Sequence, residues 1–585
     1  MMKERISSLR AALQSQGLDG FIQPRNDEFL GEYVPDSAAR LAWLTGFTGS
    51  AGLAIVLPDQ AAVFSDGRYT LQLESQTDGA IWQRLHITET PPETWLKTRG
   101  HRGQIGYDPW LMSANTITKF TDAGLTMVPI ANPIDKFWND RPAPPSAQAT
   151  PHPIECAGES ATAKRQRIAT TIGDDGADAV LLTDPHAIAW LLNLRGADLP
   201  HTPIALCFAL LRRDASAILF IDPAKIPPET RAQLGQSVSI VPREAMAETL
   251  ATLRGKRIRL DPATAPIRLT QMLGDAGAIT VSGDDPCVLP RALKNPVEQS
   301  GARAAHIRDG AAMCRFLAWF DLTAPTGSLT ELAAAAALRA YRAAAPAFRA
   351  ESFNPISGAG EHGAIIHYSA DEASNRAIHP NEVYLIDSGA QYPDGTTDIT
   401  RTLWTGPATP PDLITDRFTR VLAGHIALAS AIFPADTTGP QLDALARAPL
   451  WQAGLDFDHG TGHGVGSYLS VHEGPVSFHK RAKPIPLAPG MILSDEPGYY
   501  EPGAFGIRLE NLLLVTEAPL TTKKPFLAFE TLTLAPFDRR LINPTLLTPQ
   551  AITWLNTYHA RILQEISPLV DEQTQTWLKT ACAAI

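Results

Sequence analysis

The N-terminal part of the chain alternates between two hydrophobic patterns. Residues 7–14 and 38–43 carry apolar side chains at helical spacing, whereas residues 20–24 and 53–57 form the short apolar runs of buried strands. Strands that alternate with helices predict an α/β layer.

The same pattern returns after a break. Clustered prolines between residues 135 and 145 interrupt the periodicity and predict a domain boundary. Beyond them, residues 177–183 repeat the pattern of residues 18–23, and the segment around Trp190 repeats the segment around Trp43. The two tryptophans lie about one domain length apart, which indicates a tandem duplication. Chance similarity between amphipathic helices is the alternative.

The second half of the chain is organised differently. Apolar spacing predicts a long helix that includes residues 302–322, and Ser328 with Glu331 predicts a capping box at the start of the next helix. Helical spacing resumes at residues 547–559 and predicts a C-terminal cap on the preceding domain. At 585 residues the chain is too long for a single core, which fits several domains.

Composition and charge exclude several classes of protein. A net charge of −11 argues against nucleic acid or an anionic membrane surface as a partner. The first residues lack the apolar core of a signal peptide, and no stretch offers the roughly 18 apolar residues of a membrane span. The 5 cysteines are scattered without CxxC spacing, which argues against disulfides or structural zinc and favours a reducing cytoplasm.

Two acids flank a predicted turn. Asp387 ends the apolar run at residues 383–386, and Asp398 lies on an alternating stretch further on. Residues 392–395 between them are a strong turn signal, so a hairpin would bring the two carboxylates roughly opposite each other. Like charges that face each other across strands are destabilising, and a bound cation would relieve that repulsion. A solvated acid suits only Asp394, within the turn.

Two further acids follow or adjoin apolar strands. Glu496 comes shortly after the apolar run at residues 490–494. Glu510 lies in an alternating stretch that puts Arg508 and Glu510 on one face. An exposed Arg–Glu surface pair is the alternative, but the apolar run at residues 512–515 favours a central strand.

Two histidines lie in a glycine-rich segment. His459 and His463 are four residues apart, but glycines at positions 460, 462, 464 and 466 disfavour a helix. We predict a tight loop whose backbone approaches another segment closely. The chain contains neither HExxH nor GxxxxGK[ST], so a zincin helix and a nucleotide-binding loop are both excluded.

Charge balance indicates two metal ions. The four carboxylates carry four negative charges, which two divalent cations would neutralise. Four carboxylates and one neutral imidazole form a hard, oxygen-rich site that favours Mn²⁺, with Co²⁺ or Zn²⁺ as alternatives. Two such ions about 3.5–4 Å apart can hold a bridging water and lower its pKa. The sequence therefore predicts a two-metal hydrolase site.

These residues stand in six motifs that resemble those of a known family. The motifs are Gly363-Ala-Ile-Ile-His-Tyr, Ile386-Asp-Ser-Gly-Ala-Gln-Tyr, Asp394-Gly-Thr-Thr-Asp-Ile-Thr-Arg-Thr, His459-Gly-Thr-Gly-His-Gly-Val-Gly, Asp495-Glu-Pro-Gly-Tyr-Tyr and Glu501-Pro-Gly-Ala-Phe-Gly-Ile-Arg-Leu-Glu-Asn. Over nearly its whole length the chain resembles the pita-bread metallopeptidases, which include creatinase, prolidase, methionine aminopeptidase and aminopeptidase P. The long, three-domain aminopeptidases P are the most similar group.

The resemblance implies an α/β and α+β multidomain fold. A creatinase-like α/β domain would occupy residues 1–145 and its duplicate residues 146–292. A pita-bread catalytic domain would follow at residues 293–535, with a C-terminal helical extension at residues 536–585 packed on it.

The resemblance also implies a set of site residues. The five metal ligands would be Asp387, Asp398, His463, Glu496 and Glu510, of which Asp398 and Glu510 would bridge both ions. His367, His459 and His472 match the histidines that bind substrate and steady the transition state. Arg508, Tyr500 and residues 66–69 match other family positions without an assigned step.

By resemblance, the function would be that of a metal-dependent aminopeptidase (Xaa-Pro aminopeptidase). A metal-bridging hydroxide would attack the Xaa–Pro amide and release the N-terminal residue of peptides with proline second. The resemblance implies peptide substrates with N-terminal Xaa-Pro and a homodimer. The cysteine usage and the charge described above predict a cytoplasmic protein with no nucleic-acid or membrane partner. The alternatives are a prolidase acting on Xaa-Pro dipeptides and a non-catalytic binding protein on the same scaffold. The duplicated front end counts against the first, and the complete set of ligand types against the second.

Overall fold

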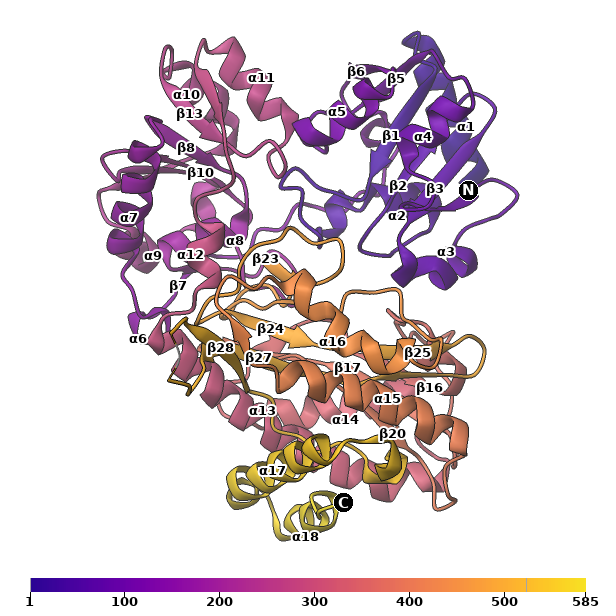
Figure 1. Ribbon diagram of the computed structural model, residues 1–585. Coiled ribbons are helices and arrows are strands. Elements are labelled where there is room, and N and C mark those ends of the chain that lie inside the picture. Colours follow the sequence, from indigo (N-terminus) through magenta and orange to yellow (C-terminus); the bar gives the residue numbers. More distant parts are fainter. Residues whose placement is uncertain (1, 522) are drawn as a thin grey trace. The chain divides into compact units, whose positions relative to one another are not determined.

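The computed structural model describes residues 2–521 and 523–585, which form two compact units (Figure 1). The first unit extends to Pro153 and resumes at Glu159–Val288. The second unit takes in Ile154–Gly158 and Leu289–Ile585.

The first unit contains two six-stranded sheets of identical topology. The strand orders are β4-β3-β2-β1-β5-β6 and β12-β11-β10-β8-β13-β14. In both sheets the third strand of the order pairs antiparallel with its two neighbours, and all other neighbouring strands are parallel. The strands are β1 (Gly20–Pro24), β2 (Leu53–Val56), β3 (Ala61–Ser65), β4 (Gln83–His86), β5 (Gln104–Tyr107), β6 (Thr126–Pro129), β8 (Ala179–Leu182), β10 (Phe208–Arg212), β11 (Ala217–Phe220), β12 (Val238–Val241), β13 (Arg257–Leu260) and β14 (Ile279–Ser282). This repetition confirms the predicted duplication.

Helices flank both sheets at equivalent positions. Trp43 lies on α2 and Trp190 on α8, the elements that the sequence comparison had matched. The helices of this unit are α1 (Met2–Ser15), α2 (Arg40–Thr45), α3 (Thr70–Gln76), α4 (Pro92–Thr98), α5 (Ala114–Asp122), α7 (Ala161–Asp174), α8 (Pro185–Leu192), α9 (Pro228–Leu234), α10 (Met246–Ala251) and α11 (Ile267–Asp275).

The second unit combines two three-stranded sheets and one six-stranded sheet, all antiparallel, with a hairpin. One three-stranded sheet pairs β15 (Ala350–Glu351), β18 (Ala390–Tyr392) and β19 (Gly395–Thr396). The other three-stranded sheet, called the smaller sheet, has the order β16-β17-β20, and the larger, six-stranded sheet has the order β21-β28-β27-β24-β22-β23. The strands are β16 (Ile356–Ala359), β17 (Val383–Ser388), β20 (Ile399–Trp404), β21 (Phe433–Pro434), β22 (Gly462–Gly464), β23 (Glu473–Phe478), β24 (Ile492–Asp495), β27 (Asn511–Glu517) and β28 (Phe526–Thr531), with β25 (Gly498–Glu501) and β26 (Phe505–Arg508) in the hairpin.

Long helices bury the apolar faces of these strands. Residues of α13 and α14 pack against the smaller sheet, where Phe320 stacks on Tyr384 with ring centroids 4.6 Å apart. Residues of α15, α17 and α18 share a second core with β26. The helices are α13 (Pro296–Thr323), α14 (Glu331–Ala343), α15 (Asp412–Ala429), α16 (Gly439–Trp451), α17 (Pro549–Ile566) and α18 (Glu572–Ala581). The predicted C-terminal helical extension is therefore present.

The predicted capping box at Ser328 is wrong. The cap of α14 is Thr330, whose side chain accepts a hydrogen bond from the Ala333 amide. Glu331 is fully buried, and its carboxylate accepts from the amide of Ala359 and the hydroxyl of Tyr368 instead. A carboxylate with buried partners of its own cannot reach back to an exposed cap.

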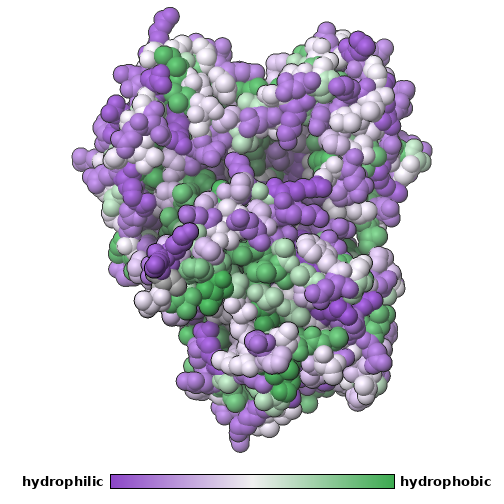
Figure 2. All heavy atoms as spheres, viewed as in Figure 1, coloured by the Kyte–Doolittle hydropathy of each residue, from purple (hydrophilic) through white to green (hydrophobic). Residues whose placement is uncertain are grey.

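The surface mixes polar and apolar residues. On the face shown in Figure 2, polar side chains are interspersed with scattered apolar groups. Within residues 2–521 and 523–585, no helix combines the length and the apolar character that a bilayer crossing requires.

Candidate metal centre

A β-hairpin carries the first two carboxylates. β17 and β20 pair antiparallel, and the turn at residues 392–395 lies between them, as predicted. Asp387 lies opposite Thr400, so Asp387 and Asp398 are diagonal rather than directly opposite. Both acids are buried, at 7% and 4% exposed, which excludes a solvated acidic turn for either.

The glycine-rich segment forms a short strand where a loop was predicted. β22 lies between β23 and β24 in the larger sheet. A Cβ atom at Gly462 would lie only 1.9 Å from the Ser494 carbonyl oxygen, so glycine is needed for the strands to pair. The predicted close backbone approach is thus correct. His463 Nδ1 donates to the Gly464 carbonyl at 3.0 Å, which leaves Nε2 available as a ligand.

The other two acids lie at strand ends. Glu496 directly follows β24, and Glu510 occupies the break between β26 and β27. The predicted continuous strand is interrupted there because the chain passes from the hairpin into the larger sheet. The Glu510 amide donates to the Thr400 carbonyl at 3.1 Å, which joins the break to β20. Arg508 and Glu510 are 2% and 1% exposed, so the alternative of an exposed surface pair is excluded.

The five candidate ligands converge. Asp398, His463 and Glu510 each offer one ligand atom, and these three atoms lie within 4.8 Å of one another. His463 Nε2 is 3.7 Å from Asp398 Oδ2 and 3.4 Å from Glu496 Oε1. Asp387 is linked to the cluster through Arg508, which donates to Asp387 Oδ2 at 2.6 Å. Arg508 also donates from Nε to Thr400 Oγ1 at 3.4 Å, the hydroxyl that donates to Glu510.

Burial and mutual repulsion raise the pKa of three of these carboxyl groups. Burial raises the pKa of Asp398 well above its usual value, and the charges of Asp387 and Glu496 add to the effect. Burial, followed by the charge of Asp398, does the same to the pKa of Glu510. Burial also raises the pKa of Glu496 to about 7, although Arg508 opposes the shift. The anionic cluster therefore needs a compensating positive charge at neutral pH.

The donor set fits divalent cations. Within the described part of the chain, Asp387 Oδ1 and Asp398 Oδ1 are buried without a hydrogen-bond partner. A buried carboxylate oxygen is costly unless a hydrogen bond or a cation satisfies it. Carboxylates with one imidazole nitrogen are the ligands that hard and borderline divalent ions prefer.

A hydrogen-bond chain leads outward from Asp387. Arg508 donates from Nη2 to Asp387 Oδ2 at 2.6 Å and from Nη1 to the Tyr500 hydroxyl at 2.7 Å. His459 Nδ1 donates to the Gly460 carbonyl, so Nε2 accepts from the Tyr500 hydroxyl at 2.8 Å. Burial raises the pKa of Tyr500 to about 12, which keeps the hydroxyl protonated. Arg508 and Tyr500, left without a role by the motifs, thus orient Asp387 and His459.

The two remaining histidines occupy different positions. His472 immediately precedes β23, and its ring packs edge-on against His463 with centroids 4.3 Å apart. His367 follows the short helix η7 (Gly360–Ala364) and is partly buried. Because η7 packs against β26, the segment with His367 adjoins the strand that ends at Arg508.

Two hydroxyl groups at the centre were missed from the sequence. Thr400 Oγ1 donates to Glu510 Oε2 at 2.8 Å, and Ser494 Oγ donates to Glu496 Oε1 at 3.3 Å. Each hydroxyl lies two residues from a predicted ligand, Asp398 or Glu496. The alternation of a strand would have placed each on the same face as that ligand.

Thr400→Val tests the first of these contacts. The substitution keeps the shape but leaves Glu510 without its hydroxyl donor. We expect metal affinity to fall roughly 10–100-fold, the usual effect of losing a residue that orients a ligand. Metal titration of stripped wild type and variant measures the change, and equal affinities would show that Thr400 does not orient Glu510.

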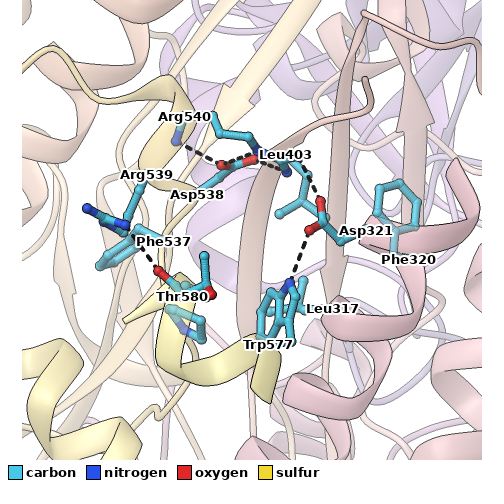
Figure 3. A pocket seen from close by; sticks show the side chains of 12 residues that line it. Leu317, Phe320, Asp321, Leu403, Phe537, Asp538, Arg539, Arg540, Trp577 and Thr580 are labelled. Atoms are coloured by element: carbon cyan, nitrogen blue, oxygen red, sulfur yellow. Dashed lines mark hydrogen bonds and ion pairs between the residues drawn. The ribbon is translucent and has the colours of Figure 1, made fainter. Parts of the chain in front are cut away.

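A separate pocket lies between α13 and the C-terminal extension (Figure 3). Phe320, Leu403 and Trp577 give it apolar walls. Three of its charged side chains pair with one another, since Arg540 contacts Asp321 and Asp538, each at 2.7 Å. Arg539 donates to the Thr580 carbonyl at 3.1 Å. None of the predicted site residues lines this pocket, so it is not part of the metal centre.

Family models match the chain along most of its length. The creatinase/prolidase N-terminal domain matches residues 5–137 and again residues 140–298. Metallopeptidase family M24 matches residues 300–517, and the C-terminal region of peptidase M24 matches residues 525–585.

Known proteins are similar over the full chain. A probable Xaa-Pro aminopeptidase P of Aspergillus flavus is 38% identical, covering 98% of this chain and 92% of that protein. Aminopeptidase P2 of Arabidopsis thaliana is 36% identical, covering 99% of this chain and 88% of that protein. The crystal structure of X-prolyl aminopeptidase from Caenorhabditis elegans, a cytosolic enzyme with a di-nuclear active site, matches with a TM-score of 0.94 and 32% identity over 100% of both chains.

The chain therefore belongs to metallopeptidase family M24, and it is an enzyme with a centre for two divalent metal ions. Within that family its full-length relatives put it in the aminopeptidase P group, which confirms the resemblance drawn from the motifs. A Xaa-Pro dipeptidase from Bacillus anthracis shares the fold over 65% of this chain, with a TM-score of 0.53 and 23% identity.

Proposed function

We propose that this enzyme releases the N-terminal residue from peptides whose second residue is proline. The convergence of three buried carboxylates and the partly buried Glu496 with His463 carries the proposal. Similarity to Xaa-Pro aminopeptidases over the whole chain supports the choice of substrate.

The candidate ligands divide between two ions in the proposal. Asp398 and Glu510 would hold both ions, Asp387 would complete one site, and His463 with Glu496 would complete the other. Divalent ions bound there supply Lewis acidity, which polarises the scissile carbonyl and lowers the pKa of water. We propose Mn²⁺ because carboxylate oxygens dominate the donor set.

The surrounding side chains position the peptide. An Xaa–Pro bond has no amide hydrogen, so recognition falls on its carbonyl oxygen. His472, beside His463, donates to that oxygen, and His367 holds the substrate. His459, whose two ring nitrogens bond to the Gly460 carbonyl and the Tyr500 hydroxyl, contacts the substrate with its ring. Arg508 and Tyr500 keep Asp387 and His459 in place through the hydrogen-bond chain described above.

Substrate length separates this proposal from the prolidase alternative. With Mn²⁺ present, we expect the protein to cleave Arg-Pro-Pro and longer Xaa-Pro peptides, and to cleave the same peptides with alanine second at least about tenfold more slowly, a difference of 1.4 kcal/mol in the barrier. Activity confined to Xaa-Pro dipeptides would support a prolidase, and no metal-dependent cleavage would support a binding protein.

Three further features belong to the proposal. We propose a homodimer, which light scattering coupled to size exclusion tests, and a cytoplasmic location, as described for the Caenorhabditis elegans enzyme. We also retain domain boundaries after residues 145, 292 and 535, which limited proteolysis tests.

A further inference from the structure

Glu473, directly after His472, is held by two buried cations. Its Oε1 accepts a hydrogen bond from Lys294 Nζ at 2.5 Å, and its Oε2 lies 3.2 Å from Arg291 Nε. The three side chains are at most 6% exposed. Lys294 precedes Glu473 by 179 residues, so the contact fixes two distant segments of the second unit to each other.

Lys294 itself is anchored through its backbone. Its amide donates to the Gly490 carbonyl at 3.0 Å, and its carbonyl accepts from Gln299 Nε2 at 2.7 Å. Gly490 has a φ of +94°, and a Cβ atom there would lie 2.6 Å from the Lys294 carbonyl oxygen. The close fit requires glycine and leaves Lys294 little freedom to move.

Glu473 also closes the loop that joins two histidines of the centre. A bulge shifts the pairing of β22 with β23, so that His463 opposes Ser477 while Gly464 opposes Glu473. A Cβ atom at Gly464 would lie 2.3 Å from the Glu473 carbonyl oxygen. The loop between His463 and His472 therefore has Glu473 at both of its ends. Glu473 follows His472 in the chain, and it pairs with Gly464, which follows His463.

We propose that Glu473 is a positioning residue that acts through His472. Its ion pairs with Lys294 and Arg291 hold the His472 ring against His463 and toward the scissile carbonyl. The inference rests on the proposed function, in which His472 donates to that carbonyl. A buried ion pair suits this role because moving either partner leaves a charge without compensation.

A double-mutant cycle in the full-length, metal-loaded enzyme tests the proposal. The variants are Glu473→Gln, His472→Ala and the combination of both, assayed on Arg-Pro-Pro with metal content measured in parallel. We expect Glu473→Gln alone to lower kcat roughly 10–100-fold, with two metal ions retained and KM changed less than about threefold. In the His472→Ala background the same substitution should cost less than about threefold, because the two residues act together.

The contrary outcomes are distinct. Losses that multiply, loss of a metal ion, or a wild-type rate for Glu473→Gln would each overturn the positioning role. If Glu473→Gln does not fold, Lys294→Met takes its place in the double-mutant cycle with the same expected losses in kcat. In that variant Arg291 still pairs with Glu473, so the buried carboxylate keeps one cation. A wild-type protein without Xaa-Pro cleavage overturns the proposed function and this inference with it, whereas an active wild type with multiplying losses overturns only the inference.

Glu530→Gln is the matched control. It breaks the partly exposed ion pair between Glu530 and Arg303 of α13, at 2.7 Å, in the same unit. A partly exposed pair contributes little, so kcat should stay at the wild-type value. If Glu530→Gln lost as much activity as Glu473→Gln, the loss in both variants would come from general destabilisation, and the proposal would be overturned.

Discussion

Replacing Asp398 by asparagine is expected to lower kcat/KM by about three orders of magnitude or more while leaving the fold intact. In our account Asp398 would hold both ions, so the substitution would weaken both sites at once. Metal-ion catalysis is worth several kcal/mol, and each 1.4 kcal/mol is a factor of about ten in rate. Peptide cleavage measures the loss, and the thermal unfolding of the stripped proteins reports on the fold.

Asp394→Asn is the control for this substitution. Asp394 lies in the turn of the same hairpin, is partly exposed, and pairs with Arg308 outside the metal centre. Its loss should change the rate less than about twofold, because partly exposed ion pairs contribute little. A near-normal rate for Asp398→Asn would exclude the bridging role.

Removing the metal is expected to make the stability of the protein fall as pH rises from 5 to 8. In the metal-free protein the pKa values of Asp398, Glu496 and Glu510 are raised above those of the unfolded chain. At a pH between the unfolded-state and folded-state pKa values, the folded protein therefore binds more protons than the unfolded chain. The free energy of unfolding that these protons contribute is fully present below the unfolded-state pKa values. It is lost as pH rises through the folded-state pKa values, and the folded-state pKa of Glu496 is about 7.

The expected change is large enough to measure. Glu496 alone would contribute on the order of a few kcal/mol, since each pKa unit corresponds to about 1.4 kcal/mol. Saturating divalent metal should remove the pH dependence and raise the melting temperature, because it binds the ionised cluster of the folded state. Melting temperatures from pH 5 to 8, with chelator and with metal, make the comparison, and a flat profile in chelator would contradict the raised pKa values.

The acids of the centre were predictable because each ends or adjoins a hydrophobic run. A carboxylate directly after buried residues, as at Asp387, has few alternatives to burial, and the turn signal at residues 392–395 predicted the hairpin. The duplication was predictable for a similar reason, since equivalent strands and helices around Trp43 and Trp190 keep the same spacing. These are local properties of the chain.

What could not be predicted depends on contacts between distant segments. β22 has the composition of a loop, yet it forms a strand. Glycine at position 462 has no Cβ atom, so the neighbouring backbone can come within 1.9 Å of the point where a Cβ would stand. Glu331 reads as a helix-capping residue, but its partners lie beyond the helix, at Ala359 and Tyr368. Arg508 reaches Asp387 across 121 residues, which no local pattern indicates.

We propose that two divalent ions hold the carboxylates of the centre together. Calorimetric titration of Mn²⁺ into chelator-treated protein near pH 6.5, in buffers of different ionisation enthalpy, tests this most directly. We predict two equivalents per chain and release of protons on binding, because ligands with raised pKa values must ionise. One equivalent or none, or binding without proton release, would contradict the account.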